Sequence, residues 1–314
     1  MTLQVTVLAG GLSYERDVSL RSGRRVADAL HRVGVDVALR DADAGLLGAL
    51  SELAPDAVYI ALHGAPGEDG ALRGVLDAAG VPYVGAPAAA SRLAWDKPVA
   101  KTVLRGAGVT TPDWLALPHD TFRELGAGAV LDRVVKHLGL PLMVKPANGG
   151  SGLGATPVFD AADLPAAMMS CFAYGGTALV ERYVVGVDVA VTVLETETGH
   201  AALPPVEIEP VDGVYDYTAR YTAGTTRWYA PARLDDATRD RLTETALRAH
   251  TALGLRDLSR VDTIVTPAGD VHVLEVNVSP GMTETSLVPL AVTAAELDLG
   301  TVCRSLVERA AARG

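Results

Sequence analysis

The first part of the chain alternates between short apolar runs and longer segments with helical periodicity. This alternation restricts the fold more than any other feature. The runs that read as strands are residues 4–9, 35–39, 57–62 and 81–85. The intervening segments that predict helices are residues 17–33 and 70–79. Strands that alternate with helices are typical of a parallel sheet, so the sequence predicts an N-terminal parallel α/β layer.

The rest of the chain predicts two further units, making the protein α+β overall. A helix that starts near Asp96 ends at Gly106 and Gly108, and Thr111-Pro112 opens a segment that we expect to be irregular. The elements expected next are residues 131–137 (helix), 142–145 (strand), 156–159 (strand), 164–170 (helix) and 178–181 (strand). Strands recur after residue 188, with helices near 235–253 and 294–312. We therefore predict three domains, over residues 1–95, 96–183 and 184–314.

Residues 260–277 predict a β-hairpin with polar side chains on one face. Two alternating segments flank the turn Pro267-Ala268-Gly269-Asp270. If Thr266 pairs with Val271, counting back along both strands fixes the other pairs, provided that no bulge intervenes. The pairs predicted in this way are Asp262 with Glu275 and Arg260 with Asn277.

Two carboxylates that face each other on one side of a sheet repel unless a cation lies between them. Asp262, Glu275 and Asn277 offer hard oxygen ligands, which suit Mg²⁺ and not zinc. Magnesium also accepts phosphate oxygens, so a nucleotide is the natural further ligand. An exposed polar strand face with one Arg–Asp pair explains the same residues, and the hairpin alone leaves both interpretations open.

The segment 149–154 is rich in glycine and carries Ser151, so its N–H groups and hydroxyl suit an anion. The string Gly150-x-Gly152-x-x-Ala155 fits a relaxed dinucleotide fingerprint, but that fingerprint must open a helix and here a strand follows. No Gly-Lys-Ser/Thr closes a P-loop. What remains is a flap between two antiparallel strands that would cover phosphates, although a surface loop is the commoner explanation of such a segment.

Four further charged side chains stand out in the sequence. Lys145 precedes the loop, and Lys97 starts the earlier helix. Glu181 ends a strand and Asp188 follows a turn. Taken singly, each is more commonly a solvated surface charge; taken together, they suit phosphates, an adenine edge and a ribose.

Composition excludes several classes of protein. The net charge of −11 argues against a nucleic-acid surface, and no apolar run reaches the roughly 18 residues of a membrane span. The first residues lack the basic and apolar segments of a signal peptide. Two cysteines without a CxxC pair indicate neither disulfides nor a zinc site. We expect a cytoplasmic protein without membrane or nucleic-acid partners.

Taken in order, the motifs resemble the D-alanine–D-alanine ligase family of the ATP-grasp superfamily, almost from end to end. The segments that carry the resemblance are Gly10-Gly11-x-Ser13-x-Glu15-Arg16-x-Val18-Ser19, Leu62-His63-Gly64, Gly67-Glu68-Asp69-Gly70, Pro82-Tyr83-x-Gly85, Asp96-Lys97, Lys145-Pro146 with the glycine loop, Glu181-x-Tyr183, Tyr215-Asp216-Tyr217-x-x-Arg220-Tyr221 and Glu275-Val276-Asn277-x-x-Pro280-Gly281-Met282-Thr283-x-x-Ser286-Leu287-Val288-Pro289.

The resemblance implies a three-domain ATP-grasp fold and an enzyme that joins two D-alanine molecules for peptidoglycan synthesis. The reaction would use ATP and pass through an acyl phosphate. A homodimer is also implied. By position, the ligands of two Mg²⁺ ions (Mn²⁺ also suits the donor set) would be Asp262, Glu275 and Asn277. The residues that match the nucleotide site are Lys97, Lys145, Glu181, Asp188 and Arg220.

The resemblance also assigns residues to the amino acids. Glu15 matches the residue that holds the first ammonium, and Ser151 and Tyr221 match its partners in a hydrogen-bonded triad. Those that match the substrate carboxylate and oxyanion positions are His63, Arg260, Gly281, Ser286 and Leu287. Without the family pattern, Glu15 reads as a helix cap, His63 as a strand-end histidine bonded to the backbone, and Tyr221 as a half-buried loop residue.

Four positions depart from the usual family pattern, namely Gly149, Gly152, Asp188 and Arg220. Tyr221 favours an amine as the acceptor. The departures motivate one rival, an ATP-grasp ligase of specialised metabolism that joins or cyclises a different amino acid. A second rival is a nucleotide-binding module without activity, which the intact set of predicted metal ligands disfavours. A nicotinamide dehydrogenase fails because a strand follows the glycine loop.

Overall fold

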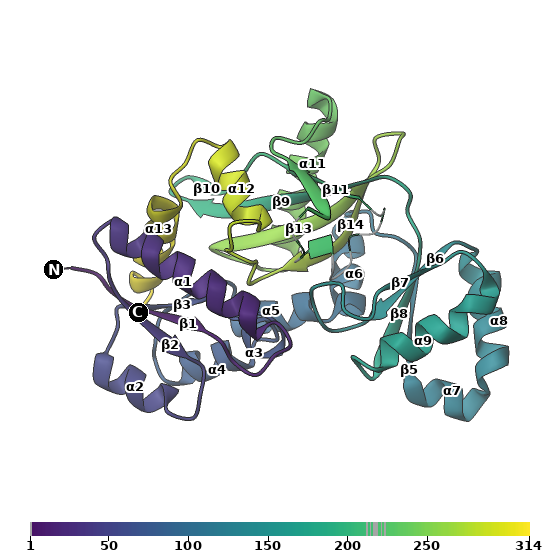
Figure 1. Ribbon diagram of the computed structural model, residues 1–314, viewed down its shortest axis with the longest axis horizontal. Helices are drawn as coiled ribbons and strands as arrows, with labels where there is room; N and C mark the ends of the chain where they lie inside the picture. The colour runs from purple at the N-terminus through teal and green to yellow at the C-terminus, as the bar shows by residue number, and fades with distance from the viewer. Residues whose placement is uncertain (1, 212, 214, 216–218, 221, 223) are drawn as a thin grey trace.

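A parallel sheet forms the N-terminal layer of the computed structural model, which describes residues 2–211, 213, 215, 219–220, 222 and 224–314 (Figure 1). Its strands are β1 (Gln4–Ala9), β2 (Asp36–Asp41), β3 (Ala57–Ile60) and β4 (Tyr83–Val84), in the order β2-β1-β3-β4. All neighbouring pairs are parallel. The accompanying helices are α1 (Arg16–Arg32), α2 (Leu46–Leu53), α3 (Ala65–Glu68) and α4 (Ala71–Ala78). The predicted parallel α/β layer is thereby confirmed.

A second sheet is antiparallel and lies at the opposite end of the molecule (Figure 1). Its strands are β5 (Trp114–Pro118), β6 (Leu142–Pro146), β7 (Thr156–Val158) and β8 (Thr177–Arg182), in the order β5-β8-β6-β7. Its helices are α7 (His119–Leu125), α8 (Ala127–Leu138) and α9 (Leu164–Phe172), with a 3-10 turn at Ala161–Asp163. The glycine loop joins β6 to β7, an antiparallel pair, as the sequence predicts.

The prediction of an irregular segment after Thr111-Pro112 was wrong. Residues 114–118 form β5, which pairs with β8 through five residues. Its local pattern is weak, because the strand is short and ends in Pro118. An edge strand tolerates proline, and the pairing with β8 is what defines it.

The third and largest sheet is also antiparallel and is called the large sheet below. Its strands are β9 (Val187–Thr196), β10 (Gly199–Ala202), β11 (Val206–Pro210), β12 (Thr226–Tyr229), β13 (Leu258–Val265) and β14 (Val271–Asn277), in the order β12-β11-β9-β13-β14 with β10 beside β9. The helices α5 (Ala88–Trp95), α6 (Lys97–Gly106) and α11 (Asp236–Ala252) pack on one face through a core of Ala, Val and Leu.

The opposite face of the large sheet meets the N-terminal layer. One core joins residues of β9, β11 and β13 to residues of β1, β3 and α1, through α12 (Leu287–Ala294) and α13 (Leu299–Ala311). The C-terminal helix α13 lies against α1, β3 and β4, so the two ends of the chain share one region (Figure 1). Burial of apolar side chains from both ends therefore holds this layer against the large sheet.

The helix expected near 294–312 begins five residues later, as α13, and a separate helix, α12, precedes it. Glu296 has φ +57 beyond the end of α12, which interrupts the helical path. Asp298 then caps α13, because its carboxylate accepts a hydrogen bond of 2.8 Å from the Thr301 N–H.

Within the described ranges, no helix is both long and apolar enough to cross a membrane.

Candidate active site

The hairpin of β13 and β14 places polar side chains at the centre of the molecule. Val265, not Thr266, pairs with Val271, so the predicted pairing at the turn was wrong by one residue. A β-bulge beyond Asp262 restores the register, and the pairs further along are Asp262 with Glu275 and Arg260 with Asn277, as predicted. The extra residue in β14, Leu274, compensates for a turn that is one residue longer than predicted.

Two adjoining clefts contain the predicted site residues that the structure describes. The smaller cleft, of about 870 Å³, is lined by Glu15, His63, Glu68, Ser151, Arg260, Asn277, Gly281, Ser286 and Leu287, among others. The larger cleft, of about 1140 Å³, is lined by Met143, Lys145, Glu181, Asp188, Ile208, Asp262, Ile264 and Leu274, among others. The residues that line both clefts are Lys97, Gly149, Gly150, Tyr215, Arg220 and Glu275.

The glycine loop closes over the smaller cleft through Ser151. Its hydroxyl donates a hydrogen bond to Oε1 of Glu15, which comes from the loop between β1 and α1. Glu15 occupies the N-cap position of α1, but its side chain makes no capping bond, so the helix-cap explanation of this residue is not supported. Burial raises the Glu15 pKa, while the Ser151 hydroxyl opposes that shift. Tyr221, the third predicted member of this triad, lies outside the described residues.

His63 lines the smaller cleft with both ring nitrogens engaged by the protein. The Met282 N–H donates to Ser22 Oγ at 3.1 Å, so the Ser22 hydroxyl is placed to donate to His63 Nε2 at 2.9 Å. His63 Nδ1 then donates to the Ser279 carbonyl at 3.0 Å. Burial lowers the His63 pKa to about 4, so the ring is neutral at pH 7. In this arrangement His63 ties the N-terminal layer to the segment that follows β14.

Glu68 is a buried carboxylate to which the sequence assigns no role, although it lies within one of the family segments. It faces the smaller cleft and accepts a hydrogen bond of 3.2 Å from the Gly64 N–H. Burial, followed by the nearby charge of Glu15, raises the Glu68 pKa to about 8. The smaller cleft therefore holds two neighbouring carboxylates with raised pKa values.

The larger cleft pairs opposite charges. Glu181 is 2% exposed and lies 2.5 Å from Lys145 Nζ and 2.9 Å from Lys101 Nζ. Burial by itself would raise the Glu181 pKa, but Lys101 and Lys145 lower it overall. Lys101 was missed in the sequence, where its spacing of four residues from Lys97 in one helix is a weak signal. Burial lowers the Lys101 pKa to about 8.

Charges concentrate where the two clefts meet. Lys97 Nζ donates to the Gly149 carbonyl at 2.6 Å and lies 3.4 Å from Glu275 Oε2. Burial would raise the Glu275 pKa, but the surrounding lysines and arginines lower it to about 2. Arg260 binds Asp262 through two bonds of 2.6 and 2.7 Å. Glu275 is therefore an anion within a ring of cations.

Asp188 and Arg220, which were predicted for the nucleotide site, are not isolated surface charges. Asp188 lies in the larger cleft, where burial raises its pKa to about 6 although Arg220 opposes the shift. The Arg220 guanidinium stacks 4.3 Å from the centre of the Tyr215 ring.

The start of α12 forms the far wall of the smaller cleft. Ser286 Oγ accepts a hydrogen bond of 3.0 Å from the Thr283 N–H, and Leu287 begins the helix. Gly281 lies so close that a Cβ atom would stand 2.7 Å from Ser286 Oγ. The N–H groups at a helix start attract anions, so this wall suits a carboxylate.

The donor set at the hairpin fits a hard divalent cation by its chemistry. Asp262 and Glu275 are direct partners across β13 and β14, and Asn277 follows on the same side of β14. Among the residues that the structure describes, no three His, Cys, Asp or Glu side chains gather as a metal site. The third oxygen donor here is an amide, which that set of residue types does not include.

The chain matches the family described as D-ala D-ala ligase C-terminus over residues 103–308. A D-alanine–D-alanine ligase from Anaeromyxobacter sp. (strain Fw109-5) is 43% identical over 308 residues, which are 98% of this chain and 97% of that one.

Two solved structures share the whole fold. The VanG D-Ala:D-Ser ligase from Enterococcus faecalis has a TM-score of 0.83 at 27% identity and covers 98% of this chain and 99% of its own. The Bacillus anthracis D-alanine–D-alanine ligase complexed with ATP has a TM-score of 0.81 at 26% identity, with 99% and 98% covered. The chain therefore has the predicted ATP-grasp fold and belongs to the D-alanine–D-alanine ligase family.

Proposed function

We propose that this protein is an ATP-dependent ligase that joins two D-alanine molecules into D-alanyl-D-alanine for peptidoglycan precursor synthesis. The observation that carries the proposal is the shared wall of the two clefts. The polar smaller cleft and the largely apolar larger cleft meet at Lys97, Arg220 and Glu275. A carboxylate held in the first cleft would there meet the terminal phosphate of a nucleotide held in the second.

The smaller cleft suits two amino acids. Glu15, held by Ser151, would bind the ammonium group of the first D-alanine. The N–H groups at the start of α12, with Ser286 and Leu287, would bind the carboxylate of the second. His63 would act near the first carboxylate as a neutral neighbour, because both of its ring nitrogens bond to the protein.

The larger cleft suits ATP. Apolar side chains such as Met143, Ile208 and Leu274 would sandwich the adenine base, and Glu181 would accept from its amino group. Asp188 would bind the ribose. Lys97 and Lys145, with Arg220, would contact the phosphates, and the glycine loop would cover them.

Two Mg²⁺ ions are proposed to accompany ATP, held by Asp262, Glu275 and Asn277. Bound there, Mg²⁺ would neutralise charge on the phosphate oxygens.

The chain's own residues then account for the chemistry. The first D-alanine carboxylate attacks the γ-phosphorus, giving an acyl phosphate and ADP, while Lys97 and Arg220 stabilise the developing negative charge. The amine of the second D-alanine attacks the acyl carbon, and Arg260 with the Gly281 N–H stabilises the tetrahedral oxyanion. Phosphate then leaves and the peptide bond remains. The closed flap, bonded through Ser151, excludes water that would hydrolyse the acyl phosphate.

The test is ATP-dependent phosphate release measured with D-alanine, D-serine, D-lactate and a panel of D- and L-amino acids, with products identified by mass. We expect turnover with D-alanine alone and a product of the mass of D-alanyl-D-alanine. Turnover with another amino acid and none with D-alanine would overturn the assigned substrate. Omission of Mg²⁺ in the presence of a chelator should abolish the reaction.

Three further proposals rest on the family. We propose a cytoplasmic homodimer whose domains span residues 1–95, 96–183 and 184–314. Light scattering would measure the mass of the particle, and a monomer would contradict the proposed dimer.

A further inference from the structure

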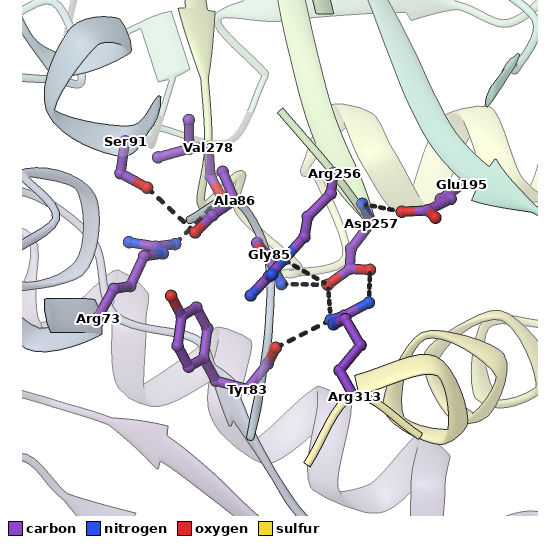
Figure 2. A network of polar contacts seen from close by, with 10 residues as sticks. All are labelled: Arg73, Tyr83, Gly85, Ala86, Ser91, Glu195, Arg256, Asp257, Val278 and Arg313. Atoms are coloured by element: carbon purple, nitrogen blue, oxygen red, sulfur yellow. Dashed lines mark hydrogen bonds and ion pairs between the residues drawn. The ribbon is translucent and has the colours of Figure 1, made fainter. Parts of the chain in front are cut away.

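Asp257 is a fully buried carboxylate in the connection between α11 and β13 (Figure 2). Its Oδ2 atom accepts a hydrogen bond of 2.7 Å from the Gly85 N–H. Arg313 donates to both of its oxygens, at 2.8 and 2.6 Å. Neither cleft is lined by Asp257, so the site described above does not use it.

The backbone of Asp257 is fixed to the large sheet. Its N–H donates to Glu195 Oε2 at 2.9 Å, and its carbonyl accepts from the Glu195 N–H at 2.8 Å. Asp257 also has φ +62, a conformation that favours glycine. A buried aspartate at such a position indicates that its side-chain contacts outweigh the conformational cost.

The partners of Asp257 come from the N-terminal layer and from the end of the chain. Gly85 follows β4, at the point where the chain leaves the parallel sheet for α5. Arg313 follows α13 and also donates to the Tyr83 carbonyl at 3.2 Å. Arg256 Nε donates to the Gly85 carbonyl at 2.9 Å, so both polar backbone groups of Gly85 bond to the two residues that precede β13 (Figure 2). Asp257 thus ties the joint at Gly85 to the large sheet.

The smaller cleft takes residues from both sides of this joint in the chain, whereas the described residues of the larger cleft all follow it. The smaller cleft takes Glu15, His63 and Glu68 from the N-terminal layer and Arg260 from the large sheet. The larger cleft is lined, among the described residues, from Lys97 onward, which is after the joint. Asp257 lies three residues before Arg260 in the chain. A shift of the N-terminal layer would therefore change the smaller cleft and leave the walls of the larger cleft in place.

We propose that Asp257 and Arg313 are a positioning pair that sets the N-terminal layer against the large sheet and so fixes the geometry of the smaller cleft. The inference rests on the proposed function, because it assigns the first amino acid to this cleft. Its consequence is a split: the pair controls affinity for the amino acid and does not control affinity for the nucleotide.

Other contacts between the same layers keep the fold together without this pair. Ser279 Oγ bonds to the carbonyls of Ile60 and Leu62 at 3.2 and 2.8 Å. Arg73 Nη2 donates to the Val278 carbonyl at 3.3 Å (Figure 2). The apolar core shared by α1, α13 and the large sheet is also unaffected. Loss of the pair should therefore displace the layer slightly, without unfolding the protein.

The test uses the full chain with Asp257→Gly, which suits the positive φ and removes the carboxylate, and Arg313→Gln, which removes the charge of the second partner. Arg239→Gln is the control, because Arg239 forms an ion pair with Asp236 within α11 and joins no layers. We expect the apparent KM for D-alanine to rise about tenfold in both variants, with the Kd for ADP unchanged within about twofold. Arg313→Lys keeps the charge but not the paired geometry, so its KM for D-alanine should lie between those of the wild type and Arg313→Gln.

Hydrogen exchange provides a readout that does not depend on turnover. The Gly85 amide should exchange faster in Asp257→Gly than in the wild type, since its acceptor is gone. Unchanged exchange together with an unchanged KM for D-alanine would overturn the proposal, as would an equal loss of ADP affinity. If the wild type does not use D-alanine, the exchange and ADP measurements still decide whether the pair holds the joint. Should Asp257→Gly fail to fold, Arg313→Gln and Arg313→Lys supply the same comparison.

Discussion

The two clefts are built in different ways. The smaller cleft draws residues from the N-terminal loop at Glu15 through to Leu287, so its walls come from separate layers of the molecule. The larger cleft lies between two antiparallel sheets and is lined from Lys97 to Glu275. The smaller cleft therefore depends on how the N-terminal layer is held, whereas the larger cleft takes none of its described lining residues from that layer.

The two clefts also differ in the charges around their carboxylates. In the smaller cleft two carboxylates lie near each other, and the pKa values of Glu15 and Glu68 are both raised. In the larger cleft a buried carboxylate has two cations, and the pKa of Glu181 is lowered. In the first arrangement burial disfavours the charged carboxylates, and a substrate ammonium would stabilise them. The second is neutralised before any ligand arrives.

Replacement of Glu275, which lines both clefts, should have the largest effect. Glu275→Gln removes the anion that faces both clefts while keeping the shape of the side chain. We expect kcat to fall about a thousandfold or more, because a proposed metal ligand and the partner of Lys97 are lost together. The measurement is phosphate release at saturating D-alanine and ATP. Glu52→Gln, on the exposed side of α2, is the control, and turnover of Glu275→Gln within tenfold of wild type would contradict the assignment.

Glu68 allows the cost of burying a carboxylate in the smaller cleft to be measured as a change in stability with pH. Its pKa is raised from 4.5 to about 8, so its stabilising contribution is fully present below pH 4.5 and is lost as the pH rises through about 8. We expect the free energy of unfolding to fall by about 1.4 kcal/mol per pH unit over most of this window from this group. Glu68→Gln, which cannot titrate, should lose that slope in urea unfolding between pH 5 and pH 9. Parallel curves for the two proteins would show that Glu68 is ionised throughout.

Ser151→Ala should test directly whether the two clefts bind their ligands independently. It removes the hydroxyl that bonds to Glu15, so the flap loses a charge-assisted contact over the smaller cleft. Such bonds contribute about 1.5–3 kcal/mol, which corresponds to a loss of roughly 10- to 100-fold in kcat/KM for D-alanine. The Kd for ADP should hardly change, because Ser151 does not line the larger cleft. Ser170→Ala on α9 is an exposed control, and an equal loss in ADP binding would count against the separation.

Much of both clefts could be predicted because the residues lie in short contiguous motifs. Strand periodicity predicted the pairing of Asp262 with Glu275, although the turn and the bulge each deviate by one residue. The parallel N-terminal layer followed from the alternation of strands and helices. Tyr221 was predicted as a catalytic residue but lies outside the described residues.

The residues that were missed have meaning only through distant contacts. Asp257 accepts a hydrogen bond from Gly85, which is 172 positions away in the sequence. No local sequence pattern near either residue predicts that contact. Lys101 reads as a surface lysine of an amphipathic helix until folding places Glu181 beside it. Glu68 acquires its raised pKa from burial and from Glu15, neither of which is a local property. Local patterns therefore predict the elements and motif residues, but not the groups that set their electrostatics.

Lys101 gives the smallest effect and the sharpest test of the larger cleft. Its ammonium lies 2.9 Å from Glu181, while Lys145 lies 2.5 Å from the same carboxylate. If Lys145 leaves Glu181 to contact a phosphate, Lys101 is the cation that remains with the buried carboxylate. Lys101→Met removes that cation at similar length, so Lys145 is held at Glu181 and the Kd for ADP should rise about tenfold, or about 1.4 kcal/mol.

The control for this change is Lys136→Met, on the exposed face of α8. Calorimetric titration with ADP gives the Kd, and the apparent KM for D-alanine should stay within about twofold, because Lys101 and Glu181 do not line the smaller cleft. A raised KM for D-alanine with unchanged ADP binding would mean that the charges of the larger cleft act across the seam at Lys97 and Glu275. The two clefts would then be coupled electrostatically, and the independence inferred from their separate walls would be wrong.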